Sequence, residues 1–129
     1  LAPELSALST DVCVPISRLA ECVAATQADI REHGFLAPIV GHAGDGNFHV
    51  LLLFNDKDAA EMEKAEAFLE RLNGRALAME GTCTGEHGVG QGKIRYLEQE
   101  LASALPTMRA IKAGLDPDNI FNPGKIFRL

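Results

Sequence analysis

An Asp-Gly pair between two apolar stretches is the strongest local constraint on how this chain can fold. Asp-Gly is typical of the two-residue type I′ turn that joins antiparallel strands. We therefore expect a hairpin of residues 36–44 and 47–54 with Asp45-Gly46 at its tip. In that register His42 lies directly opposite His49, with the two Cβ atoms about 5 Å apart on one face of the sheet.

Two imidazoles on one sheet face can bind the same divalent metal ion, with bonds of about 2.1 Å. A third ligand, Glu86, is available in the segment Gly85-Glu86-His87-Gly88. Two neutral histidines and one carboxylate leave coordination positions open, which is typical of a catalytic metal, and zinc and manganese both fit such a site. Structural roles are the alternative. His42 and His49 could be strand histidines that hydrogen-bond to the backbone, and Glu86 could cap a helix N-terminus. Asp45 is expected to be a turn residue rather than a metal ligand.

The open positions suggest chemistry on a 2-hydroxy acid, which can bind a metal through its carboxylate and its hydroxyl. Metal binding lowers the pKa of the hydroxyl. His87, next to Glu86 in the sequence, is the candidate general base that takes the hydroxyl proton. No group in the chain accepts hydride, so a flavin or nicotinamide must be held elsewhere. The glycine-rich segment 85–93 matches neither a Walker A loop nor a GxGxxG motif, which disfavours a phosphate loop. Lys93 either contacts an anionic substrate or is solvated.

Composition narrows the class of protein. The 129 residues carry a net charge of −6 without a cluster of Lys or Arg, which disfavours nucleic-acid and anionic-membrane binding. The longest apolar run, residues 50–54, is too short to span a bilayer. Three cysteines without CxxC spacing favour a reducing compartment, and we expect a cytoplasmic protein. The first residue is Leu1 rather than Met, so we expect a piece of a longer protein.

The remaining patterns predict alternating strands and helices. Apolar spacing predicts a helix over 17–33 that ends at Gly34, and a second helix from Asp56 or Asp58 to about Met79. We also expect short strands at 11–14 and 82–84, a helical region at about 97–113 with Pro106 as its start or a kink, a turn at 116–119 and an irregular tail over 120–129. This order is that of an α+β, ferredoxin-like fold: one domain over 1–129, with an antiparallel sheet and helices on one face. The open sheet face would cover a partner domain or form a homodimer.

Four motifs in this order resemble the C-terminal domain of FAD-linked oxidases of the vanillyl-alcohol-oxidase type. The branch that fits holds D-lactate dehydrogenase (cytochrome), the glycolate oxidase FAD subunit and D-2-hydroxyglutarate dehydrogenase. The motifs are Asp11-Val12-Cys13-Val14-Pro15, Gly41-His42-Ala43-Gly44-Asp45-Gly46-Asn47-Phe48-His49, Gly81 through Lys93, and Asp116 through Lys125.

The resemblance implies roles for single residues. It implies a metal on His42, His49 and Glu86, a catalytic His87, and Asn122 near the flavin. It further implies that this chain is the substrate-binding cap of a longer flavoenzyme. The FAD-binding domain would precede this segment, and the isolated chain would be inactive.

Two hypotheses follow. In the first, the chain is part of an FAD-dependent dehydrogenase of a D-2-hydroxy acid such as lactate, glycolate or 2-hydroxyglutarate, at the membrane periphery if its electron acceptor lies there. In the second, it is a stand-alone ferredoxin-like module that binds a metal or a small anion without catalysis.

Overall fold

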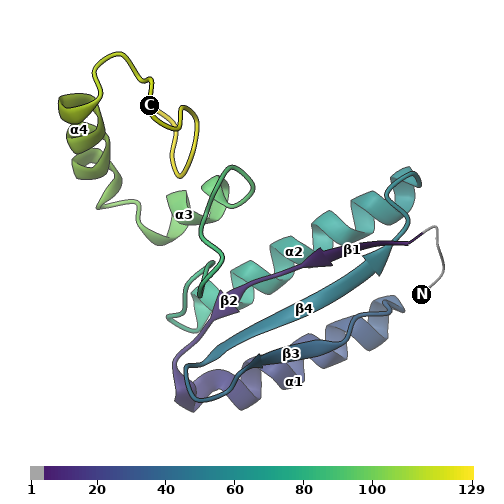
Figure 1. The fold of residues 1–129 in the computed structure, drawn as a ribbon. Coiled ribbons are helices and arrows are strands. Elements are labelled where there is room, and N and C mark those ends of the chain that lie inside the picture. Colours follow the sequence, from purple (N-terminus) through teal and green to yellow (C-terminus); the bar gives the residue numbers. More distant parts are fainter. Residues whose placement is uncertain (1–4) are drawn as a thin grey trace. The chain divides into compact units, whose positions relative to one another are not determined.

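Two helices and an antiparallel sheet make up the first part of the chain (Figure 1). The computed structural model describes residues 5–129. These residues form two compact units, one ending at Glu86 and the other running from His87 to Leu129, and each is described by itself. The first unit contains β1 (Ser6–Ser9), β2 (Val12–Cys13), α1 (Ile16–His33), β3 (Ile39–His42), β4 (Asn47–Phe54) and α2 (Ala59–Ala78).

β4 lies at the centre of the sheet. β1 and β2 pair with one of its edges in a single continuous register, from Ser6 opposite Phe54 to Val12 opposite Phe48, and β3 pairs with the other edge. An isolated antiparallel bridge adds Thr82 beside Cys13. This arrangement confirms the α+β class and the ferredoxin-like strand order. The strand expected over 82–84 is reduced to the single bridge at Thr82, and β1 was not predicted.

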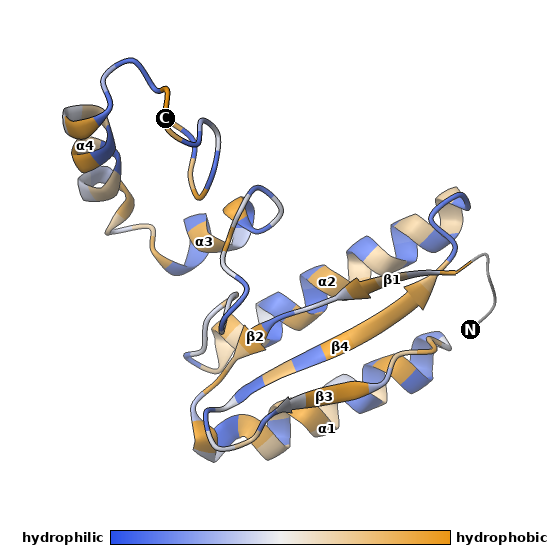
Figure 2. Ribbon diagram, viewed as in Figure 1, coloured by the Kyte–Doolittle hydropathy of each residue, from blue (hydrophilic) through white to orange (hydrophobic). Residues whose placement is uncertain are grey.

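Side chains of β4 point alternately to the two faces of the sheet, and those on one face form the core between the sheet and the helices. Every second residue, from Phe48 to Phe54, is buried in one cluster with residues of α1 and α2, including Cys22, Phe68 and Leu72. Figure 2 shows β4 as hydrophobic along most of its length and polar near its start. Both helices lie on one face of the sheet (Figure 1), as expected. Fully burying a Phe or Leu side chain contributes about 2 kcal/mol, so this face holds the unit together.

Local sequence signals set the ends of the two helices. α1 ends at Gly34, whose φ of 69° is the left-handed conformation that glycine adopts without strain. α2 begins after Asp58, whose carboxylate accepts a hydrogen bond of 2.9 Å from the Ala60 N–H. The structure therefore selects Asp58 over Asp56 as the cap.

The second unit holds two short helices rather than one helical region. α3 spans Ile94–Glu100 and α4 spans Leu105–Leu115, with Pro106 in the first turn of α4, so this proline marks a start and not a kink. Residues 116–129 contain neither helix nor strand, as expected for the tail. None of the helices that the structure describes has the length and apolar content needed to cross a membrane.

A buried carboxylate joins α1 to α2. Asp29, whose side chain is 5% exposed, accepts hydrogen bonds from Arg71 at 2.7 Å and from Arg75 at 2.9 Å. Burial alone would raise the pKa of Asp29, but the hydrogen bonds from the two arginines outweigh it and hold the pKa below its usual value.

We expect Asp29→Asn to lower the free energy of unfolding at pH 7 by about 2 kcal/mol, because two arginines lose a charged acceptor. The stabilisation from a lowered pKa is present above the unfolded value of about 3.9 and is lost as pH falls through the folded value. Urea unfolding between pH 7 and pH 3 measures this loss, which should be absent in the variant. Glu21→Gln, at an exposed ion pair with Arg18, is the control and should leave stability unchanged. Equal stability of Asp29→Asn and wild type would contradict the assigned role.

Candidate metal centre

The hairpin that carries the two histidines has a different register from the one expected. His42 pairs with Asn47 and Val40 pairs with His49, so the connection is the four-residue loop 43–46. The predicted type I′ turn at Asp45-Gly46 and the direct opposition of His42 and His49 are therefore wrong. The observed register differs from the predicted one by two residues, and side chains alternate between faces with a period of two. Both histidines consequently stay on the same face, diagonally placed.

Contacts with the end of β2 explain the longer loop. The Asp45 N–H donates to the His42 carbonyl at 2.9 Å, which closes a turn, and Gly46 follows with a φ of 75°. The Val14 N–H then donates to the Gly46 carbonyl at 3.0 Å. A Cβ on Gly46 would lie 2.0 Å from the Val14 carbonyl oxygen, so only glycine fits this position. This tertiary contact overrides the local preference for a two-residue turn.

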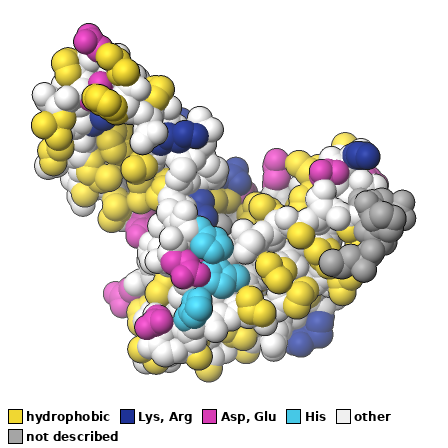
Figure 3. All heavy atoms as spheres, in the orientation of Figure 1, with side chains coloured by type: hydrophobic (Ala, Val, Ile, Leu, Met, Phe, Trp, Pro, Cys, Tyr) yellow, Lys and Arg dark blue, Asp and Glu magenta, His cyan; other side chains and the backbone are white. Residues whose placement is uncertain are grey.

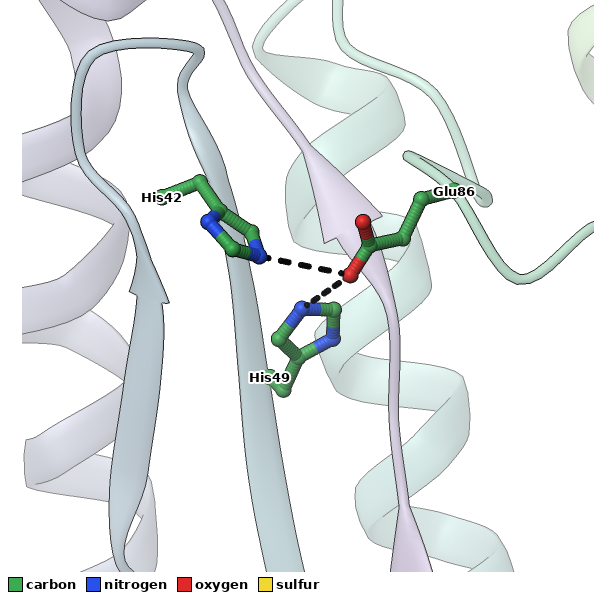
Figure 4. Close-up of side chains that lie close together, drawn as sticks. All are labelled: His42, His49 and Glu86. Carbon is green, nitrogen blue, oxygen red and sulfur yellow. Dashed lines mark ion pairs between the residues drawn. The ribbon is translucent and has the colours of Figure 1, made fainter.

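The two histidines of the hairpin and the distant Glu86 converge on the sheet face opposite the helices (Figure 4). Glu86 Oε1 lies 2.9 Å from His49 Nε2 and 3.5 Å from His42 Nε2. The two rings stand almost perpendicular, with their centroids 5.9 Å apart. One potential ligand atom from each residue lies within 4.8 Å of the others. The structure thus brings together the three residues that the sequence predicted as metal ligands.

The cluster is anchored on its inner side and open on its outer side. The His49 side chain is 8% exposed, whereas those of His42 and Glu86 are 57% and 47% exposed. Figure 3 shows histidine and acidic side chains next to each other at the surface. Small molecules can therefore reach the point on which the three side chains converge.

A backbone hydrogen bond selects the tautomer of His49. Its Nδ1 lies 2.9 Å from the Thr10 carbonyl oxygen, which can only accept, so Nδ1 carries the proton. In the neutral ring Nε2 then presents a lone pair toward the carboxylate of Glu86, which is also an acceptor. A cation between them satisfies both, and a metal-bound histidine commonly donates its other N–H to a carbonyl.

The donor set and spacing fit a divalent metal. Tetrahedral bonds of about 2.1 Å separate neighbouring ligand atoms by about 3.4 Å. The distances from Glu86 Oε1 to the two imidazole nitrogens, 2.9 and 3.5 Å, lie on either side of this value. Two imidazoles with one carboxylate suit zinc, and also manganese. Asp45 is outside the cluster and lies in the loop, in agreement with its expected role as a turn residue.

The backbone around Glu86 is held by a buried carboxylate. Asp11 Oδ2 accepts hydrogen bonds from the Thr84 hydroxyl at 2.9 Å, the Gly85 N–H at 2.9 Å and the Glu86 N–H at 3.1 Å. A Cβ on Gly85 would lie 2.4 Å from Oδ1 of Asn47, so any larger residue at position 85 would force the Asn47 side chain to move. The alternative of Glu86 as a helix cap is wrong, because the next helix begins at Ile94.

Three further candidates lie in the second unit. His87 follows Glu86 directly in the sequence, Lys93 precedes α3, and Asn122 has a φ of 46° in the tail. Asn122 lines a hollow of this unit together with Lys112 and Lys125. The roles of His87, Lys93 and Asn122 stay predictions, and so does the single domain over 1–129.

Two buried residues next to the cluster were missed. Thr10 and Asp11 were given no role from the sequence, although both are buried and contact His49 or the loop before Glu86. An acidic residue next to the apolar Val12-Cys13-Val14 was an available signal, because a buried charge needs partners.

Comparison with known proteins places the chain in a family. It is 50% identical to "Probable D-lactate dehydrogenase, mitochondrial" of Danio rerio, over 100% of this chain and 26% of that protein. It is 46% identical to "D-lactate dehydrogenase [cytochrome], mitochondrial" of Arabidopsis thaliana, over 98% and 22%, and 40% identical to "Glycolate oxidase subunit GlcD" of Bacillus subtilis, over 91% and 25%. The chain thus spans about a quarter of the length of these relatives. The profile of the FAD linked oxidases, C-terminal domain, matches residues 1–126, and the chain belongs to this family.

Proposed function

We propose that this chain is the metal- and substrate-binding part of an FAD-dependent dehydrogenase that oxidises a D-2-hydroxy acid to the 2-oxo acid. The observation that carries the proposal is the convergence of His42, His49 and Glu86 on one point at an open surface. The names of the relatives, D-lactate dehydrogenase and glycolate oxidase, supply the substrate class. Lactate, glycolate and 2-hydroxyglutarate all belong to it.

Each group of the chain has one task in this mechanism. His42, His49 and Glu86 would hold the divalent metal, zinc or manganese, and the chemistry it would supply is polarisation of the hydroxy acid. His87 takes the proton of the substrate hydroxyl on an imidazole nitrogen, as a general base. The positively charged side chain of Lys93 contacts the substrate, which is an anion. FAD, held mainly by the part of the protein that would precede this chain, would supply the hydride acceptor, and Asn122 would lie near it.

The proposal includes partners and a compartment. The open face of the sheet covers the FAD-binding domain of the same protein or a second copy of the chain. The expected compartment is the cytoplasm, with contact to a membrane through the electron acceptor. Two of the three relatives described above are named as mitochondrial, so the compartment is a point to measure. A stand-alone binding module has less support, because the relatives carry this segment within much longer chains.

Metal content tests the ligand set. We expect the full-length protein to hold about one equivalent of zinc or manganese per chain, and His49→Ala and His42→Ala to lose it, because each removes one of three ligands. Elemental analysis of the purified proteins measures the content. His33→Ala is the matched control, since His33 lies in the last turn of α1 and outside the cluster. Full metal content in both cluster variants would overturn the proposed site.

Turnover tests the general base. We expect His87→Ala to lower kcat for D-lactate about 10²–10⁴-fold, the usual contribution of a general base, while metal content stays at the wild-type level. Steady-state kinetics with an artificial electron acceptor, on a panel of D-2-hydroxy acids, measures the effect and identifies the best substrate. Oxidation of every acid by this variant at the wild-type rate would exclude the role given to His87.

A further inference from the structure

Two residues, Thr10 and Asp11, separate β1 from β2, yet both strands pair with β4 in the same register. Ser9 faces Leu51 and Val12 faces Phe48, so Thr10 and Asp11 stand opposite Val50 and His49 without an inserted residue. A β-bulge therefore does not explain the gap between β1 and β2. Both intervening residues are buried, with Thr10 4% and Asp11 1% exposed.

A side chain replaces a backbone group at this point of the ladder. The Thr10 N–H donates to the Val50 carbonyl at 3.0 Å, as in a regular hydrogen-bonded pair. The return bond, which a regular pair makes from the Val50 N–H to the Thr10 carbonyl, goes instead to the Thr10 hydroxyl at 2.8 Å. The Thr10 carbonyl is thereby available to accept from His49 Nδ1 at 2.9 Å.

The next residue serves a second ligand. The Asp11 carboxylate is fully buried and accepts from the Thr84 hydroxyl and from two successive backbone N–H groups, those of Gly85 and Glu86. These bonds hold the chain immediately before and at Glu86. From this backbone position the Glu86 carboxylate reaches His49 Nε2 at 2.9 Å.

We propose that Thr10 and Asp11 together are the positioning element of the metal centre. The Thr10 hydroxyl takes the place of the Thr10 carbonyl in the β-ladder, so the carbonyl accepts a hydrogen bond from His49 and orients its ring. Asp11 orients Glu86 by holding the loop 84–86. This inference rests on the proposed function and adds to it two residues that contact neither metal nor substrate. Such outer partners of metal ligands typically change metal affinity about 10–100-fold when they are removed.

Paired variants separate positioning from folding. Thr10→Val keeps the shape but removes the hydroxyl, so the Val50 N–H loses its acceptor and competes with His49 for the carbonyl of residue 10. We expect Zn²⁺ affinity to fall about 10–100-fold in Thr10→Val and in Asp11→Ala. Thr10→Ser, which keeps the hydroxyl, should bind like wild type. Asp29→Asn, at a second buried acid among the described residues of this unit, should lose stability without losing affinity.

Two measurements on the full-length protein decide the outcome. Competition with a chromophoric chelator gives the Zn²⁺ affinity, and hydrogen exchange read by mass spectrometry reports the amides of Gly85 and Glu86, which Asp11→Ala should deprotect even without metal. Should Asp11→Ala not fold, Asp11→Asn and the Thr10 pair carry the same test. Wild-type affinity in both Thr10→Val and the Asp11 variant, in a protein whose wild type binds Zn²⁺, would overturn this inference alone. A wild type that binds neither Zn²⁺ nor Mn²⁺ would overturn the proposed function, and this inference with it.

Discussion

The two-sidedness of β4 is the constraint on which the rest of the first unit depends. One set of alternating side chains, including Phe48 and Val50, packs against α1 and α2, while His49 between them faces the other way. Because the strand is central, it is paired along both edges and its two faces cannot exchange. A rigid hydrophobic layer thereby supports a polar site on its reverse side.

The three side chains of the cluster come from segments that are held to different degrees. His49 is buried in the central strand, His42 stands at the end of an edge strand, and Glu86 belongs to a loop. The loop obtains its rigidity from a buried carboxylate, which would be costly to bury without the hydroxyl and amide donors it receives. The same buried charge that costs free energy in isolation thus becomes a fixed point for the site.

Much of this arrangement was predictable, and the misses have physical causes. Helix ends at Gly34 and Asp58 depend on local capping, and the grouping of His42, His49 and Glu86 came from residue type and face. The prediction of a two-residue turn was wrong because the Val14 N–H donates to the Gly46 carbonyl. This contact joins two segments, and no local signal in the sequence reveals it. The break in the edge strand at Thr10 was equally hidden, since a threonine in a strand gives no sign of which group its hydroxyl will replace.

The predicted and observed registers both place His42 and His49 on the same face, and this limits how the loop 43–46 can change during evolution. A change in loop length that moves the pairing by two residues returns His42 to the same face, as the predicted and observed registers both do. A change that moves it by one residue would turn His42 toward the helices and bring Gly41 outward. The cluster is therefore preserved by loop changes that keep the pairing or move it by two residues, and is lost when the pairing moves by one.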